Sequence, residues 1–194
     1  METKGEIYIS PQYHKDDYLR LNLSLSSSQE AWNTAVDILR DRIYGRFFNQ
    51  IDVLSADINA NGFTIMALNC LLIETLFQFR DGKGETPRPN SRTYPAFLTQ
   101  AFPSVFENRQ IAESFYSNIR CGILHSAQTK NESRLSDRTD CVVTYDGDTL
   151  VVSVNGMSSL LATYFEDYLQ KLLNKDEIKL RSNFIAKMSF VCRD

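Results

Sequence analysis

The clearest pattern in the chain is a hydrophobic side chain at every third or fourth position, which is the period of an amphipathic α-helix. It predicts a long helix over residues 32–54 and further helices over residues 107–127, 160–172 and 176–192. A Ser27–Glu30 pair has capping-box spacing and places the start of the first helix. Its hydrophobic face is predicted to contain Trp32, Ala35, Val36, Leu39, Ile43, Phe47, Ile51 and Leu54, and its solvated face Asp37, Arg40, Asp41 and Arg42. The last helix is predicted to pack through Ile178, Phe184, Ile185 and Met188.

Residues 61–82, NGFTIMALNCLLIETLFQFRDG, are hydrophobic nearly all round. Such a helix is covered by other elements on most sides, so we predict that it is the central helix of the fold. Glu74 lies within it, and a carboxylate is rarely buried without a partner that offsets its desolvation. We therefore expect Glu74 either to form an ion pair or hydrogen bond with a neighbouring helix or, alternatively, to orient a charged catalytic residue.

Two stretches have the pattern of β-strands. Leucines at positions 19, 21, 23 and 25 alternate with polar residues and predict a strand in an N-terminal segment, residues 1–26. Residues 141–155 contain two β-branched runs around Asp146 and Gly147, which predicts a β-hairpin. A polar linker, residues 126–140, precedes this hairpin.

Residues 81–95 contain glycines, prolines and polar side chains and are predicted to form a loop, followed by a short helix over residues 96–101. Four cations lie in or beside this loop: Arg80, Lys83, Arg88 and Arg92. Such a loop is either simply solvated or a place where a phosphate-binding surface is readily built. Together the patterns predict one domain, residues 1–194, with a mainly α fold: a helical bundle with a small accessory β-hairpin or sheet.

The composition narrows the possible classes of protein. With 43% hydrophobic and 23% charged residues, 194 residues can bury a core without a disulfide or metal staple. A net charge of −3 argues against coating nucleic acid by bulk electrostatics, so a nucleic-acid partner would be bound at a local site. The first residues lack a signal-peptide pattern, no stretch looks apolar enough to cross a bilayer, and the cysteines are far apart. We therefore expect a cytoplasmic protein with free thiols and no membrane partner.

The stretch SFYSNIRCGILHSA, residues 114–127, carries the candidate chemistry. In a regular helix Glu113, Ser117 and Arg120 form one polar stripe, which turns Arg120 away from the core. His125 is about 500° further round than Arg120, unless the helix distorts or ends near Gly122. On this evidence alone Arg120 could form a surface ion pair with Glu113, and His125 could interact with a helix C-terminus. No other histidine lies nearby, and no metal-binding or nucleotide-binding motif is present.

The string Arg120-Cys121-Gly122-Ile123-Leu124-His125 resembles the Arg-x4-6-His motif of the HEPN superfamily. The strings GFTIMALNCLLIETLFQFRDG, IRCGILHSAQT and LRSNFIAKMSF and the hairpin resemble a bacterial HEPN subfamily from plasmids and other mobile elements. The likeness covers most of residues 28–190. In that family the residue after the motif arginine is usually Asn, Asp or His, whereas here it is Cys121.

The resemblance implies a HEPN-like bundle that forms a homodimer and binds RNA. Many members are metal-independent endoribonucleases in toxin–antitoxin or anti-phage systems, so an antitoxin or effector protein is a further expected partner. Arg120 and His125 would be the catalytic pair, supported by Glu74, Cys121 and Ser117. Lys130, Arg80 and Arg92 would bind RNA, without a metal or cofactor. The alternative is a non-catalytic HEPN module that dimerises and binds RNA or nucleotide beside another effector.

Overall fold

The computed structural model describes residues 7–138 and 141–193, and these are mainly helical with a small sheet, as predicted. The helical elements are α1 (Lys15–Arg20), α2 (Gln29–Ile43), the π-helical segment η1 (Tyr44–Phe48), α3 (Asn49–Leu54), the 3₁₀ turn η2 (Ser55–Asp57), α4 (Ile58–Asp81), α5 (Asn90–Ala101), α6 (Arg109–Ser114), the π-helical segment η3 (Phe115–Arg120), α7 (Cys121–Ser126), α8 (Val154–Leu173) and α9 (Ile178–Val191). The strands are β1 (Arg134–Ser136), β2 (Val143–Asp146) and β3 (Thr149–Ser153).

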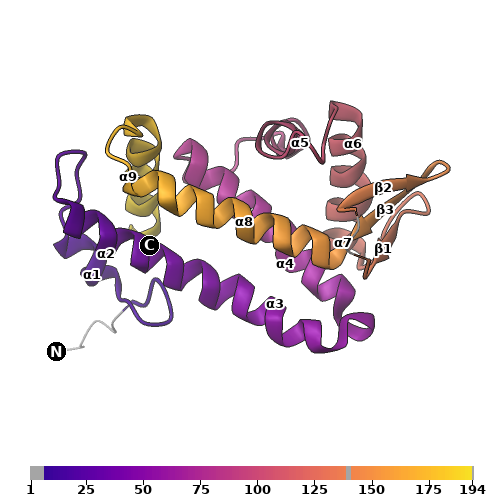
Figure 1. Cartoon of the computed structure of the whole chain (residues 1–194), viewed down its shortest axis with the longest axis horizontal. Coiled ribbons are helices and arrows are strands. Elements are labelled where there is room, and N and C mark those ends of the chain that lie inside the picture. The colour runs from indigo at the N-terminus through magenta and orange to yellow at the C-terminus, as the bar shows by residue number, and fades with distance from the viewer. Residues whose placement is uncertain (1–6, 139–140, 194) are drawn as a thin grey trace.

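Three long helical runs form the body of the molecule. α2, η1 and α3 follow one another without a break, and α8 packs against both α2 and α4 (Figure 1). α1 and α9 lie at one end of these runs, whereas α6, α7 and the sheet lie at the other (Figure 1). The predicted first and central helices are thus confirmed.

The hydrophobic core joins helices that are distant in the sequence. The Phe184 ring centroid of α9 lies 6.2 Å from that of Tyr18, 5.8 Å from that of Trp32 and 6.2 Å from that of Phe79. All four side chains are buried. Because burial of one large apolar side chain stabilises a fold by about 1.5–3 kcal/mol, this cluster fixes α1, α2, α4 and α9 to one another. Ile178, predicted to pack in the core, is instead 61% exposed, since it is the first residue of α9.

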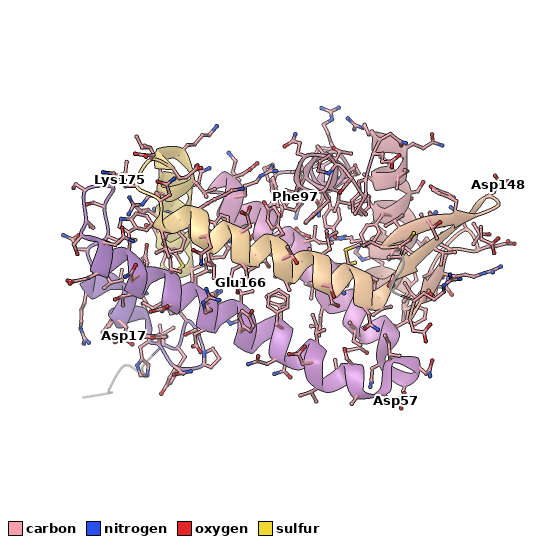
Figure 2. The ribbon with its side chains drawn as sticks, viewed as in Figure 1. Asp17, Asp57, Phe97, Asp148, Glu166 and Lys175 are labelled. Carbon is pink, nitrogen blue, oxygen red and sulfur yellow. The ribbon has the colours of Figure 1, made fainter. Side chains whose placement is uncertain are left out.

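The first helix begins one residue later than predicted, because Ser28, and not Ser27, accepts a hydrogen bond from the Ala31 N–H. Its polar face is also less solvated than predicted. The Arg40 guanidinium forms a 2.6 Å ion pair with Glu166 of α8, whose side chain points toward α2 in Figure 2. Both side chains are more than one third exposed, so this pair stabilises the fold by only about 0.2–1 kcal/mol. The Arg42 guanidinium donates a hydrogen bond to the Ile9 carbonyl.

The predicted hairpin is confirmed and has an additional strand. β2 and β3 are antiparallel, Asp146 pairs with Thr149, and Gly147 in the turn has a φ of 61°, which favours glycine. β1 pairs in parallel with the other side of β3, giving the order β1-β3-β2. The polar stretch predicted to be a linker therefore contains a strand, because three residues of it find a partner in β3.

The predicted N-terminal strand over residues 19–25 is wrong. Residues Lys15–Arg20 form α1 instead, with Asp16 and Asp17 in its first turn, where carboxylates favour a helix. Leu19 and Leu25 are about half exposed, at 49% and 45%, so the alternating leucines do not define one buried face. The described residues place no strand beside this segment, and the nearest pairing is an isolated bridge between Tyr8 and His14.

α5 begins at Asn90, so the predicted loop is shorter and the predicted short helix longer than the sequence pattern indicated. Pro95, which the sequence pattern places in the loop, lies within α5.

The described residues include one helical run, Gln29–Asp81, with an 18-residue window that is long and apolar enough to cross a membrane. Half of that window is buried in the protein. The prediction that no such stretch exists was therefore too strict. A core helix has the same composition, and α4 packs against α8 and α9.

Candidate active site

The residues of the Arg-x4-His motif lie where a π-helical segment, η3, joins α7. The Cys121 N–H donates to the Tyr116 carbonyl, which is the i→i+5 pattern of a π-helix. The Asn118 carbonyl accepts a 2.9 Å hydrogen bond from the Lys130 N–H, so the chain after α7 folds back over η3. A π segment changes the angular position of every residue after it, which is why the predicted stripe of Glu113, Ser117 and Arg120 does not form.

Arg120 points toward the central helix and not away from the core. Its Nη2 donates to Glu74 Oε2 of α4 at 3.0 Å, and the exposed fractions of the two side chains are only 13% and 21%. Asn90 Nδ2 donates to the same carboxylate oxygen at 3.3 Å. Glu74 thus forms the expected ion pair with another helix, and its partner is the motif arginine. The alternative pairing of Arg120 with Glu113 is wrong, because Glu113 pairs with Arg109 at 2.6 Å.

Two aromatic rings and a thiol complete the surroundings of the Arg120 guanidinium. Its carbon lies 5.6 Å from the Tyr116 ring centroid and 6.0 Å from that of Tyr94, both within cation–π range. Its Nη1 lies 4.0 Å from Cys121 Sγ. Burial alone lowers the pKa of Arg120, but the hydrogen bonds to Glu74 and Cys121 and the charge of Glu74 outweigh it, so the pKa is raised. Arg120 is a permanently charged group in a fixed position.

His125 lies on the exposed side of this arginine. Its Nε2 is 3.4 Å from Arg120 Nη1, and the imidazole is open to solvent. A guanidinium can only donate hydrogen bonds, so in this contact Nε2 is placed as the acceptor. Of the two possibilities near Gly122, a distortion or a helix end, the structure has the distortion, because η3 ends at Arg120 and α7 continues past Gly122 to Ser126. A methyl group at Gly122 would lie 2.4 Å from the Gln128 carbonyl oxygen, which shows that the glycine allows this close packing.

The other predicted site residues lie at different distances from Arg120 and His125. Cys121 contacts Arg120, whereas the Ser117 hydroxyl is exposed and hydrogen-bonds to the Ser114 carbonyl and to Asn118. No contact joins the Lys130 side chain to the pair in the described part of the chain. Arg92 lies on the first turn of α5, in a groove that also contains Tyr116.

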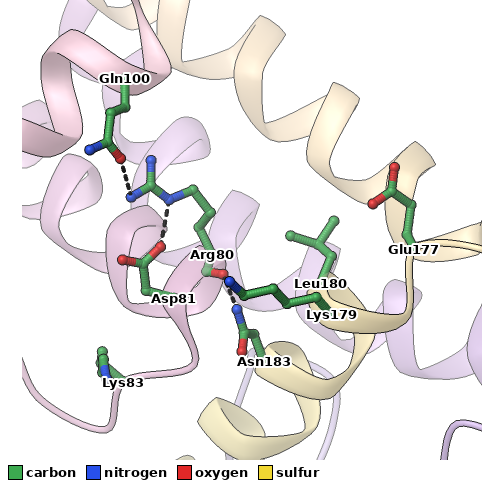
Figure 3. A pocket seen from close by; sticks show the side chains of 8 residues that line it. All are labelled: Arg80, Asp81, Lys83, Gln100, Glu177, Lys179, Leu180 and Asn183. Carbon is green, nitrogen blue, oxygen red and sulfur yellow. Dashed lines mark hydrogen bonds and ion pairs between the residues drawn. The ribbon is translucent and has the colours of Figure 1, made fainter.

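Arg80 is separated from the pair and lines a different cavity, near the C-terminal end of α4 (Figure 3). Its guanidinium forms a 2.6 Å ion pair with Asp81, a 3.2 Å hydrogen bond with Gln100 and a cation–π contact with the Phe97 ring at 4.6 Å. These contacts occupy Arg80. The structure therefore gives no support for Arg80 as an RNA-binding residue of this site.

Three residues of the site were not predicted from the sequence: Asn90, Tyr94 and Tyr116. Tyr94 is fully buried, its ring centroid is 5.5 Å from that of Tyr116, and its hydroxyl donates to the Cys70 carbonyl. Burial raises the pKa of Tyr94 and of Tyr116, so both remain neutral phenols. Tyr116 lies four positions before Arg120, a spacing that places the two side chains side by side on a helix. Nothing in the sequence connects residues 90 and 94 to position 74.

The arrangement places a proton acceptor beside a cation that suits phosphate oxygens. Nη2 of Arg120 is taken by Glu74, whereas Nη1 faces His125 and Cys121. In the part of the chain that the structure describes, no group of three His, Cys, Asp or Glu side chains could hold a metal ion. No protein-family model, no curated protein and no solved structure matches the chain.

Replacing Glu74 with glutamine is expected to lower the free energy of unfolding by about 1.5–3 kcal/mol, because the largely buried Arg120 cation loses its charged hydrogen-bond partner. The matched control is Glu113→Gln, which removes a surface pair with Arg109 whose side chains are 59% and 51% exposed, and should cost at most about 0.5 kcal/mol. Urea unfolding measures both. Equal losses for the two variants would show that the Glu74–Arg120 pair contributes no more than a surface pair.

Proposed function

We propose that this chain is a metal-independent endoribonuclease of the HEPN type, in which Arg120 and His125 act together on one phosphodiester. The observation that carries the proposal is the 3.4 Å separation of Arg120 Nη1 and His125 Nε2, with the arginine held from behind by Glu74. A cytoplasmic role in a toxin–antitoxin or anti-phage system, with an antitoxin or effector as a further partner, follows from the resemblance and belongs to the same proposal.

His125 is the proposed general base. Its Nε2 takes the proton of a ribose 2′-hydroxyl once bound RNA replaces the contact between Nε2 and Arg120, since imidazole exchanges protons near neutral pH. The 2′-oxygen then forms a bond to the adjacent phosphorus, and the bond from phosphorus to the 5′-oxygen breaks. The products are a 2′,3′-cyclic phosphate and a 5′-hydroxyl end.

Arg120 is the proposed electrostatic stabiliser. Negative charge builds on the phosphate oxygens as the 2′-oxygen attacks, and a fixed guanidinium at that point lowers the barrier without having to reorganise. Glu74, Asn90 and the two tyrosines hold the guanidinium in place and act as positioning residues. Cys121 supplies a weakly polar thiol where the HEPN family usually has a stronger hydrogen-bonding group.

Besides the general base, an acid must protonate the leaving 5′-oxygen, and one chain supplies one histidine to this site. A homodimer with two copies of the pair across a two-fold axis provides this group, so the proposal includes dimerisation. A protein that is strictly monomeric in solution would contradict it.

The alternative function is a non-catalytic HEPN module that dimerises and holds RNA or nucleotide for another effector. Cys121 favours this alternative, because its Sγ is 4.0 Å from Arg120 and a thiol is only a weak hydrogen-bonding group.

The test is cleavage of a mixed-sequence single-stranded RNA by the purified protein in excess EDTA. We expect fragments with 2′,3′-cyclic phosphate ends by mass spectrometry, while a DNA strand of the same sequence stays intact because it lacks the attacking hydroxyl. Cleavage of the DNA, dependence on added metal, or intact RNA would each argue against the proposed chemistry, and intact RNA would leave the non-catalytic alternative.

A further inference from the structure

The structure contains an open groove directly beside the candidate active site. It has a volume of about 540 Å³ and lies between the first turn of α5 and the α6–η3 run, two neighbouring elements in Figure 1. Its lining residues include Ser91, Arg92, Arg109, Gln110, Tyr116 and Ser117. The volume falls within the range of about 300–1,000 Å³ that bound small molecules occupy.

Tyr116 connects this groove to the site. It lines the groove, and its ring also lies 5.6 Å from the Arg120 guanidinium carbon. A phosphate held by Arg120 would therefore be separated from the groove by the width of one aromatic ring. Two further grooves, one around Arg80 and one on the sheet, include no residue that touches Arg120.

The charges in the groove differ in whether they are already paired. Arg109 forms a 2.6 Å ion pair with Glu113, which also lines the groove. The Arg92 side chain is exposed and has no ion-pair or hydrogen-bond partner among residues 7–138 and 141–193. Arg92 is therefore the cation that can bind a phosphate without first breaking another contact.

We infer that this groove binds the nucleotide next to the scissile phosphate of a single-stranded RNA, an inference that rests on the proposed function and deepens it. Arg92 contacts the phosphate of that nucleotide. Tyr116 presents aromatic surface to its base, and Gln110 and the hydroxyls of Ser91 and Ser117 supply hydrogen-bonding groups for base edges or the ribose. An unpaired strand is the fitting ligand because its bases can turn into such a groove, whereas those of a duplex are stacked and paired.

The experiment measures binding of a fluorescently labelled single-stranded RNA to the full chain by anisotropy between 50 and 200 mM salt. His125→Ala serves as the background so that the RNA stays intact. One lost phosphate contact reduces the slope of log K against log salt by about 0.7, which corresponds to roughly five-fold weaker binding at 0.1 M salt. We expect this change for Arg92→Ala. The matched control, Arg88→Ala, removes an equal exposed charge from the loop just before α5, lies outside the groove, and should leave the slope unchanged.

The outcomes separate this inference from the proposed function. If Arg92→Ala and Arg88→Ala have the same slope and affinity, the groove does not bind the RNA, whatever the cleavage assay shows. If the slope depends on Arg92 but the wild-type protein leaves RNA intact, the groove is retained as an RNA site and the nuclease proposal is lost. In a cleaving protein, Arg92→Ala with His125 restored should raise KM about five-fold and leave kcat unchanged.

Discussion

Replacing His125 with alanine is expected to lower kcat for RNA cleavage by about 10²–10⁴-fold, the range that a general acid–base group contributes. The imidazole Nε2 lies 3.4 Å from Arg120 Nη1, and the described residues place no other histidine in the site. Stability should change by no more than about 0.5 kcal/mol, because His125 is exposed and its hydrogen-bond contact within the described residues is with a single side chain. Activity and unfolding should therefore respond differently to the same substitution.

His14→Ala is the matched control, since the chain has only two histidines. His14 precedes α1, and its ring centroid lies 3.9 Å from that of Tyr8, so its loss should perturb local packing and leave kcat unchanged. The measurement is single-turnover cleavage with the protein in saturating excess over RNA, from about pH 5 to pH 8, the range in which imidazole takes up a proton. Superimposable RNA profiles for wild type and His125→Ala across that range would remove the enzyme interpretation.

The helical framework could be predicted because hydrophobic periodicity reports directly on which side chains are buried. Trp32, Leu39 and Phe184 are all buried as their spacing indicated. The errors arose where pairing, and not periodicity, decides the structure. Leu19 and Leu25 alternate as in a strand but have no strand beside them, whereas β1 forms in a polar stretch because β3 offers it an edge. A single sequence does not contain that long-range information.

The candidate site was predicted in part. Arg120, His125 and Glu74 were identified, Glu74 because an acid in a nearly all-apolar helix needs a partner. Its pairing with Arg120 could not be derived, since regular α-helical geometry turns Arg120 the opposite way. The π segment η3 reverses that orientation, and π turns are common at functional sites. Asn90 and Tyr94 reach the site through tertiary packing of α5, which no local pattern encodes.

Arg120 therefore has two roles that substitutions can separate, one in the fold and one in the chemistry. Arg120→Ala is expected to lower kcat by about 10²–10³-fold, the effect of removing one charged donor from a developing oxyanion. It should also cost about 1.5–3 kcal/mol of unfolding free energy, because Glu74 loses its charged partner. Arg120→Lys keeps the positive charge but has a single ammonium in place of the planar fork.

A lysine cannot donate to Glu74 from one nitrogen while a second nitrogen faces His125, as Arg120 does through Nη2 and Nη1. We expect Arg120→Lys to recover most of the lost stability in urea unfolding but little of the lost kcat. Combining Arg120→Ala with Glu74→Gln should cost less stability than the sum of the single substitutions, with a coupling of about 0.5–3 kcal/mol. Wild-type kcat in Arg120→Lys would mean that a point charge is sufficient, and the argument from guanidinium geometry would then fail.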